Sequence, residues 1–336
     1  MKNEHIPKIE LHVHLDCCLS FDVVQKLDAS IDERQYRKYF RANGKCANLA
    51  DYLQRATRAV DLMQSDRSLK LVTDDLFDQL VTDRVIYAEI RFAPLLHTRQ
   101  GLGEEEIVRI VTDAVAENIE RTGISANLIL CTLRHYSQAQ SISTAELVYA
   151  FRDQGVVALD LAADEAGFSI DNHVLAFEYA KANGMHTTAH AGEACSAESV
   201  WETIDQLKPD RIGHGIRASE DPALVEYIKH QGIHLEICPT SNIQTNIYSK
   251  MYDHPVDQLL GAGISLSINT DGRTISGTSL TEEYTKLVHA FSWGLAEFRQ
   301  VNCNALDAAF IDEDLKRALS SVIDSAYGTN LISSRQ

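Results

Sequence analysis

Eight short apolar runs recur along the chain, and segments with helical periodicity separate most of them. The alternation of short apolar runs with helical segments is typical of a parallel β-sheet covered by helices. Eight such units predict an α/β fold of the (β/α)8 TIM-barrel type, and a doubly wound open sheet is the alternative. Strands are expected over 9–14, 85–92, 127–133, 156–161, 185–190, 211–213, 233–238 and 264–269. Helices are expected over 104–121, 145–153, 173–183, 197–207, 222–231 and 255–262.

Histidines and one aspartate stand where four of these runs end. His12 and His14 close the first run, His190 the fifth and His214 the sixth, and Asp271 follows the eighth. In a closed parallel barrel, the carboxyl ends of all strands share one mouth, where enzymes of this fold keep their active sites. An open sheet would leave the first and last strands far apart, whereas closure makes them neighbours. The barrel therefore predicts one site that contains all five side chains.

A long segment, from about residue 19 to residue 83, separates the first two runs. It is expected to form several helices, with Leu49, Tyr52, Leu53 and Met63 on a helical spacing. An insertion of this size at a barrel mouth is a candidate lid. The alternative is that these side chains only pack the inserted helices onto the barrel. No linker or repeat divides the chain, so residues 1–336 are expected to form a single domain.

Charge and cysteine usage narrow the class of partner. The net charge is −17, from 48 acidic and 31 basic residues, which disfavours nucleic acid and other polyanions. An acidic surface that only maintains solubility is the simpler reading. No apolar stretch approaches a membrane-spanning length, and residues 1–7 contain no apolar signal core. Seven scattered cysteines without a C-x-x-C pair indicate reduced thiols, so we expect a cytoplasmic protein that acts on a small molecule.

His12 and His14 lie two residues apart, so on a strand they point to the same face, which in a barrel is the interior. The chain has 13 histidines, so an H-x-H pair by itself is weak evidence of a site. Neutral imidazoles combined with one carboxylate suit zinc with an open position for water. Bound zinc lowers the pKa of its water to about 7. Residues 156–165 contain no lysine that could bridge two metals, which favours one metal per chain.

Longer motifs carry a family resemblance. From about residue 7 to residue 320, the chain resembles the adenosine deaminase family of the amidohydrolase superfamily. The combination of His-Ala-Gly-Glu with a later Gly-His-Gly is much more specific than H-x-H. The resemblance is carried by Leu11-His12-Val13-His14-Leu15-Asp16, Asp160-Leu161-Ala162-Ala163-Asp164-Glu165, His190-Ala191-Gly192-Glu193, Arg211-Ile212-Gly213-His214-Gly215, Cys238-Pro239-Thr240-Ser241-Asn242 and Asn269-Thr270-Asp271.

The resemblance implies a role for each polar residue of the mouth. Glu193 would be the proton shuttle, and His214 would orient the attacking hydroxide and stabilise charge. A carboxyl at this strand end can protonate a purine ring nitrogen while hydroxide attacks the neighbouring carbon. The alternatives are that Glu193 caps the following helix and that His214 is a core histidine. Zinc would be held by His12, His14, His190 and Asp271.

The resemblance also implies substrate contacts. Asp16 would accept a hydrogen bond from the ribose 5′-hydroxyl, which favours a nucleoside over a free base and disfavours a 5′-phosphate. The backbone N–H of Ala163, where the family usually has glycine, would donate to purine N3. Leu49, Tyr52 and Leu53 resemble the apolar lid over the ribose.

Two positions depart from the family pattern. Gly272 stands where the family commonly has a second aspartate bound to purine N7. Water is the favoured replacement for that contact, and the alternatives are the Arg273 side chain or no contact at all. Cys17-Cys18 replaces the usual glycine after Asp16, which alters a turn beside the metal. Both departures concern specificity.

The sequence therefore predicts a zinc-dependent enzyme that hydrolyses adenosine and 2′-deoxyadenosine to the inosine product and ammonia by attack at purine C6. Two alternatives stay open. One is a deaminase of a modified purine nucleoside, for which Gly272 would leave room near N7. The other is a zinc-binding barrel that senses nucleosides without turnover, against which the intact Glu193 and His214 argue. The oligomeric state cannot be predicted.

Overall fold

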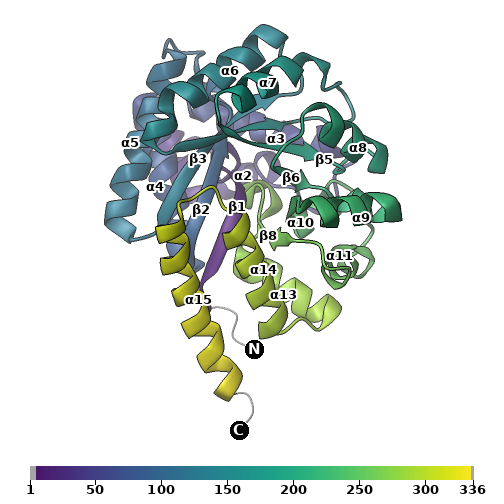
Figure 1. Ribbon diagram of the computed structural model, residues 1–336. Coiled ribbons are helices and arrows are strands. Elements are labelled where there is room, and N and C mark those ends of the chain that lie inside the picture. Colours follow the sequence, from purple (N-terminus) through teal and green to yellow (C-terminus); the bar gives the residue numbers. More distant parts are fainter. Residues whose placement is uncertain (1–4, 334–336) are drawn as a thin grey trace.

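Eight parallel strands form a barrel in the computed structural model, which describes residues 5–333 of the chain (Figure 1). The strands pair in sequence order. The barrel closes where Val13 bridges to Asp271, with the Asp271 N–H donating to the His12 carbonyl at 3.0 Å. The predicted barrel is confirmed. The strands are β1 (Lys8–His14), β2 (Val85–Phe92), β3 (Ser125–Leu133), β4 (Val156–Ala162), β5 (His186–Ala191), β6 (Arg211–His214), β7 (His234–Ile237) and β8 (Leu266–Ile268).

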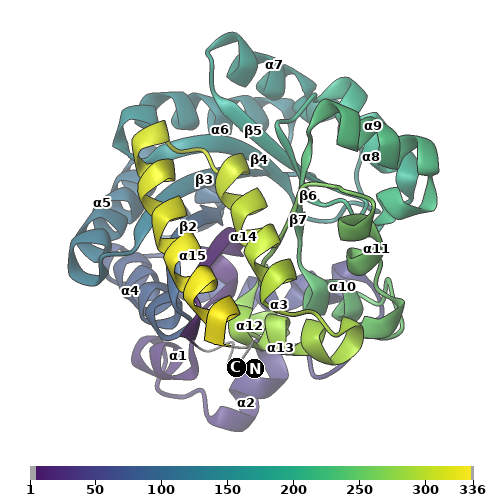
Figure 2. The same cartoon turned by 60° about the horizontal axis from the view of Figure 1, so that its bottom comes forward.

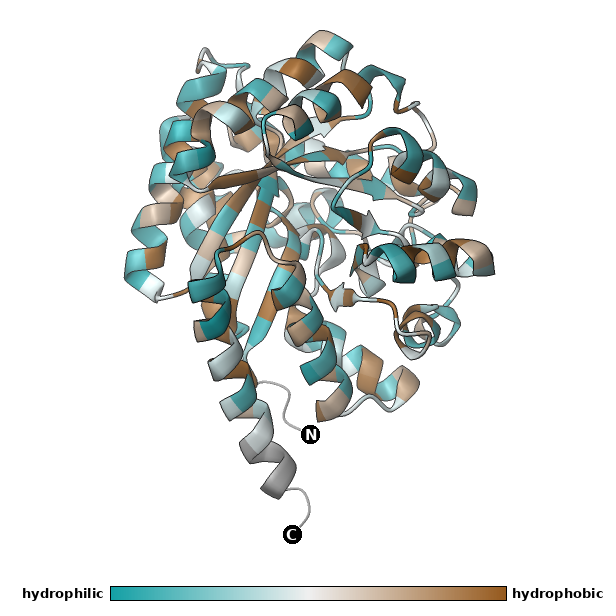
Figure 3. Cartoon of the chain, in the orientation of Figure 1, coloured by the Kyte–Doolittle hydropathy of each residue, from teal (hydrophilic) through white to brown (hydrophobic). Residues whose placement is uncertain are grey.

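Helices surround the barrel, and the sides that face the strands are the more hydrophobic (Figure 3). Five of the six predicted helices match to within one or two residues at each end. The exception is α6, which begins at Gln138 rather than 145 because a Ser137–Gln140 capping box starts it early. The helices that follow the strands are α5 (Glu104–Thr122), α6 (Gln138–Phe151), α7 (Val174–Ala182), α8 (Ala197–Gln206), α9 (Pro222–Gln231) and α11 (Val256–Gly261).

The segment between β1 and β2 forms four helices, as expected for an insertion. They are α1 (Phe21–Leu27), α2 (Glu33–Tyr39), α3 (Leu49–Leu62) and α4 (Asp66–Thr82). The α4 helix packs against α5 in the outer ring, and both α3 and α4 contact the turn that follows β1 at the barrel mouth. Of the four helices, only α3 supplies side chains that line the cavity at this mouth, so it has the position of a lid.

The C-terminal part adds helices that the sequence analysis did not predict. The short α10 (Pro239–Gln244) and α12 (Arg273–Ser276) follow β7 and β8, and α13 (Leu280–Phe291), α14 (Leu295–Ala308) and α15 (Glu313–Ser333) complete the chain. Figure 2 shows α14 and α15 side by side across the barrel. Among residues 5–333, no helix combines the length and the hydropathy needed to span a membrane.

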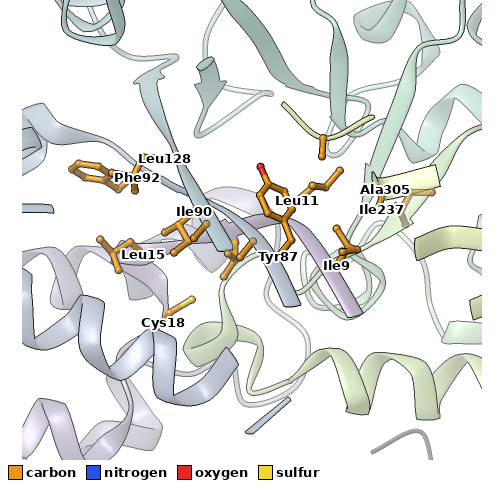
Figure 4. Close-up of a cluster of buried hydrophobic side chains, with 14 of the residues drawn as sticks. Ile9, Leu11, Leu15, Cys18, Tyr87, Ile90, Phe92, Leu128, Ile237 and Ala305 are labelled. Carbon is orange, nitrogen blue, oxygen red and sulfur yellow. The ribbon is translucent and has the colours of Figure 1, made fainter. Parts of the chain in front are cut away.

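The apolar core lies mainly between the strands and the helices. Figure 4 shows buried side chains of β1, β2 and β7 together with Ala305 of α14. Inside the barrel, by contrast, strands contribute charged side chains in ion pairs. Arg91 of β2 donates to Asp160 of β4 at 3.1 Å and to Glu236 of β7 at 2.6 Å. This charged layer lies directly beneath the mouth and supports the site.

Candidate active site

Three imidazole rings converge at the carboxyl ends of β1 and β5. The Nε2 atoms of His14 and His190 are 3.2 Å apart, and the ligand atoms of His12, His14 and His190 all lie within 4.8 Å of one another. The Asp271 Oδ1 atom lies 3.7 Å from His12 Nε2 and 3.5 Å from His14 Nε2. The four residues predicted as metal ligands are thus brought together by strands that are far apart in the sequence.

Two buried carboxylates orient two of these rings, those of His12 and His190. Glu236 accepts a hydrogen bond from His12 Nδ1 at 2.9 Å, and Asp160 accepts one from His190 Nδ1 at 3.2 Å. Burial raises the pKa of Glu236, but the arginines Arg91 and Arg211 outweigh it and hold that pKa well below its usual value. A charged carboxylate only accepts hydrogen bonds. The Nδ1 atoms of both rings therefore carry hydrogen, and their Nε2 lone pairs face the mouth.

The arrangement fits a divalent metal. The buried His12 Nε2 atom has no hydrogen-bond partner among residues 5–333, although a buried polar atom normally has one. The close approach of the His14 and His190 Nε2 atoms is likewise favourable when both lone pairs bind one cation. Three imidazole nitrogens and one carboxylate are ligands that zinc prefers. The residues present therefore fit the metal that the sequence predicts.

Glu193 and His214 lie beside these ligands. The Glu193 Oε2 atom is 3.5 Å from His214 Nε2, and both side chains are buried. Burial raises the pKa of Glu193 well above its usual value, and the Asp271 and Glu165 carboxylates add to the shift. A protonated carboxyl can deliver a proton, as general acid catalysis requires. The alternative role as a helix cap does not hold, because Ser196 occupies the N-cap of α8 and Glu193 faces His214.

One carboxylate holds the turn that presents Glu193. The Glu165 carboxylate accepts hydrogen bonds from four backbone N–H groups, with N–O distances of 2.5–3.0 Å. They belong to Gly192, Glu193, Ala194 and Cys195. It also accepts the Ser199 hydroxyl hydrogen at 2.6 Å. In the sequence, Glu165 is identified only as part of a motif. Its position straight after a buried strand, among other polar residues of the mouth, was the available signal.

A cavity of about 470 Å³ opens beside the predicted metal ligands, within the usual range for small-molecule sites. Its walls are mostly apolar and include Leu53, together with Asp16 and Ala163. Ala163 adopts a positive φ of 81°, which is the conformation that favours glycine and matches the family's usual residue there. Burial raises the pKa of Asp16 to about 6. Asp16, Ala163 and Leu53 thus line one cavity, and their contacts with substrate stay a prediction.

Two of the predicted lid residues occupy a different place. Leu49 and Tyr52 are buried against Cys17 and Ile275, and the Tyr52 hydroxyl is 2.7 Å from Ser276 Oγ. In the described part of the chain, only Leu53 of the three lines the cavity. One face of α3 lines the cavity, and the adjacent face packs against Cys17 and Ile275. The apolar spacing does not distinguish these two faces.

Gly272 does not leave open space. A Cβ atom at this position would stand 2.9 Å from Cys17 Cβ, so the two departures from the family pattern are in contact. The expectation of room beside Gly272 is therefore wrong, because Cys17 fills it. Arg273 donates to Glu10 at 2.5 Å and to Asp83 at 3.0 Å. A contact from Arg273 to substrate would break both ion pairs, whereas contact through water stays a prediction.

Comparison with known proteins shows the family and the fold of the chain. A family model described as Adenosine deaminase matches residues 7–326. The adenosine deaminase of Clostridium acetobutylicum is 35% identical over 329 residues, which cover 95% of this chain and 98% of that protein. An Arabidopsis N6-mAMP deaminase has a similar structure, with a TM-score of 0.87, 25% identity and coverage of 96% and 99% of the two chains. An amidohydrolase from Burkholderia ambifaria with bound Zn shares the fold, with a TM-score of 0.90, 21% identity and coverage of 98% and 93%.

Proposed function

The chain belongs to the adenosine deaminase family, and on this basis we propose that it converts adenosine and 2′-deoxyadenosine to inosine and 2′-deoxyinosine with release of ammonia. Membership of this family identifies the chain as an aminohydrolase that acts on a purine. The observation that carries the more specific proposal is the buried Glu193 carboxyl, 3.5 Å from His214 and beside the convergent His12, His14 and His190. This arrangement supplies a proton donor next to a site for a nucleophile.

We propose one zinc ion per chain, held by His12, His14, His190 and Asp271. When bound, zinc activates water as a nucleophile at neutral pH. The orphaned His12 Nε2 atom and the orienting Glu236 carboxylate support this ligand set. Ligand histidines are commonly oriented in this way by a second carboxylate.

Glu193 and His214 carry the proton transfers in this proposal. The Glu193 carboxyl protonates a purine ring nitrogen beside C6, which removes the aromaticity that resists attack at that carbon. It then accepts a proton from the attacking water and passes it to the departing amine. His214 stands 3.5 Å from Glu193, where its ring orients the attacking oxygen. The raised pKa of Glu193 supports this role because it favours the protonated carboxyl that the first step requires.

The cavity supports a nucleoside as substrate. Asp16 accepts the ribose 5′-hydroxyl hydrogen, the Ala163 N–H donates to purine N3, and Leu53 covers the sugar. Asp16 and Asp164 both line the cavity, and their negative charge opposes a 5′-phosphate.

A deaminase of a modified purine nucleoside is the second candidate. It is supported by the likeness to the N6-mAMP deaminase and by the apolar cavity wall, which includes Leu95, Leu96 and Leu133. A nucleoside sensor without turnover is less well supported, because Glu193 and His214 have no need to be paired in a protein that only binds. A spectrophotometric screen on zinc-loaded protein separates these functions. The screen includes adenosine, 2′-deoxyadenosine, N6-methyladenosine, adenine and AMP. Fastest turnover of adenosine supports the first proposal, and no turnover of any of them contradicts it.

A further inference from the structure

A chain of buried hydrogen bonds leads away from His214 on the side opposite Glu193. His214 Nδ1 is 3.1 Å from the Asn242 amide nitrogen, and the Asn242 amide oxygen is 3.2 Å from His254 Nε2. The Val256 backbone N–H donates to His254 Nδ1 at 3.1 Å. His214, Asn242 and His254 are each at most 3% exposed. This series of hydrogen bonds thus ends at the Val256 backbone N–H, at the start of α11.

The backbone end sets the direction of every bond, because an N–H can only donate. His254 Nδ1 must therefore accept, so a neutral His254 carries its hydrogen on Nε2. Burial lowers the pKa of His254 to about 3, which keeps the ring neutral near pH 7. The His254 Nε2–H then donates to the Asn242 oxygen. This fixes the Asn242 amide with its NH2 group toward His214.

The reversed Asn242 amide is excluded by the same logic. It would direct its NH2 group at His254 Nε2, so that both nitrogens of His254 would have to accept hydrogen bonds. A neutral imidazole has one donor and one acceptor nitrogen. With the amide in the allowed orientation, His214 Nδ1 accepts from Asn242, and the His214 hydrogen is on Nε2.

We propose that Asn242 and His254 are positioning residues that hold His214 in the Nε2–H tautomer. This tautomer distinguishes His214 from its neighbours. His12 and His190 carry hydrogen on Nδ1, through Glu236 and Asp160, and present Nε2 lone pairs to the mouth. His214 presents an N–H, so it donates to an attacking oxygen or to Glu193 and does not bind the metal. Opposite hydrogen-bond partners therefore assign ligand and catalytic roles to chemically identical side chains.

The proposal rests on the catalytic role proposed for His214, but the tautomer can be measured whether or not adenosine is the substrate. The first measurement is ¹⁵N NMR of zinc-loaded protein labelled on histidine, with the His214 signals assigned by their loss in His214→Asn. We expect a protonated Nε2 and an unprotonated Nδ1 for His214. A protonated Nδ1 on His214 in the parent protein would overturn the proposal.

The Asn242→Asp variant reverses the last bond. A carboxylate accepts from His254 as before but requires a hydrogen on His214 Nδ1, so the ring presents an Nε2 lone pair to the mouth. We expect the NMR pattern of His214 to invert and kcat to fall about 10²-fold or more, the range for general acid–base catalysis. Zinc affinity, measured by competition with a chromogenic chelator, should be kept or increased. Unchanged kcat in a variant with an inverted ring would count against the positioning role.

Two further variants separate positioning from stability. His254→Phe removes the donor to Asn242, and His254→Gln restores an N–H donor. We expect kcat to fall in the first and to recover in large part in the second, with KM little changed in both. Asn118→Asp is the matched control, since Asn118 is a buried asparagine on the outer helix α5. It should lower the melting temperature but keep kcat. Equal kcat for His254→Phe and His254→Gln would contradict a positioning role for the hydrogen bonds from His254 to His214.

Discussion

His12 Nδ1 lies 2.9 Å from Glu236 Oε2, so a carboxylate of β7 orients a histidine of β1 across the barrel interior. Arg91 donates to the same Glu236 oxygen and to Asp160, the carboxylate that orients His190. One guanidinium group therefore stabilises the charges behind two rings of the proposed metal site. Supporting groups of this kind fix ligand geometry and commonly contribute 10–100-fold to metal affinity.

Removal of the metal should abolish turnover. A chelator is expected to remove both the activity and part of the thermal stability, because a metal bound only by the folded state stabilises that state. Added Zn²⁺ should restore both. Metal content, initial rate and melting temperature are measured on the same samples. Full activity in demonstrably metal-free protein would contradict the proposed chemistry.

Glu193→Gln should reduce kcat by about 10²–10⁴-fold, as is typical when a general acid–base group is lost. The amide keeps the size of the side chain but cannot deliver a proton. Burial raises the pKa of Glu193 and so favours the neutral carboxyl, which the neutral amide replaces, so the melting temperature should change little. Steady-state kinetics with adenosine and binding of inosine provide the measurement. Near-normal turnover in this variant would remove Glu193 from the mechanism.

Glu165→Gln should impair catalysis through the turn 192–195. The amide retains one acceptor oxygen. In place of the other oxygen it puts an NH2 group, which faces N–H donors and cannot accept from them. The turn should therefore shift and displace Glu193. A misplacement of about 1 Å can cost on the order of 10²-fold in rate. Hydrogen exchange of the amides of residues 192–195 should accelerate.

The matched control for Glu165 is Asp75→Asn. Asp75 accepts the Ser20 N–H at 2.8 Å and its hydroxyl hydrogen at 2.7 Å, at the start of α1. This variant should lose stability and keep kcat. If both variants retain the parent rate and the exchange of residues 192–195 is unchanged, Glu165 has no positioning role.

Gly272→Ala should lower the free energy of unfolding, because the added Cβ would meet Cys17 Cβ at 2.9 Å. Overpacking of this kind typically costs about 1–3 kcal/mol. In a Cys17→Gly background the same change should cost much less. Urea unfolding of the four proteins of this cycle gives the coupling between the two positions. Purely additive effects would show that Cys17 does not limit the space at Gly272.

Acid should destabilise the protein partly through His97, whose side chain is buried and 2.8 Å from the Met63 carbonyl. Burial lowers its pKa from 6.5 to about 4. Between these two pH values the unfolded state binds more protons, so stability contributed by the neutral ring is present above pH 6.5 and lost toward pH 4. A shift of one pKa unit corresponds to roughly 1.4 kcal/mol, so the loss of stability amounts to about 3 kcal/mol. His97→Gln should flatten the stability profile over this range, and an unchanged slope would exclude His97 as a cause.

The barrel and the polar ends of its strands could be predicted because both depend on local pattern. The strand at 85–92 was placed at its observed bounds, and a buried parallel strand leaves this signal in any context. The position of His12, His14, His190 and Asp271 at one mouth then follows from closure alone. The early start of α6 was missed because its first turns are polar, so a cap rather than apolar periodicity begins the helix.

The sequence by itself determined the order of strands and helices and the chemistry delivered to the barrel mouth, since both are read from neighbours along the chain. Only the tertiary structure decided which charged residues support that chemistry and which side chains line the cavity. Glu236 meets His12 and Cys17 meets Gly272 across more than 200 residues of sequence, through contacts that no local pattern records. The direction of the hydrogen bonds from Val256 to His214 likewise depends on packing, because a histidine takes its tautomer from the groups placed against it.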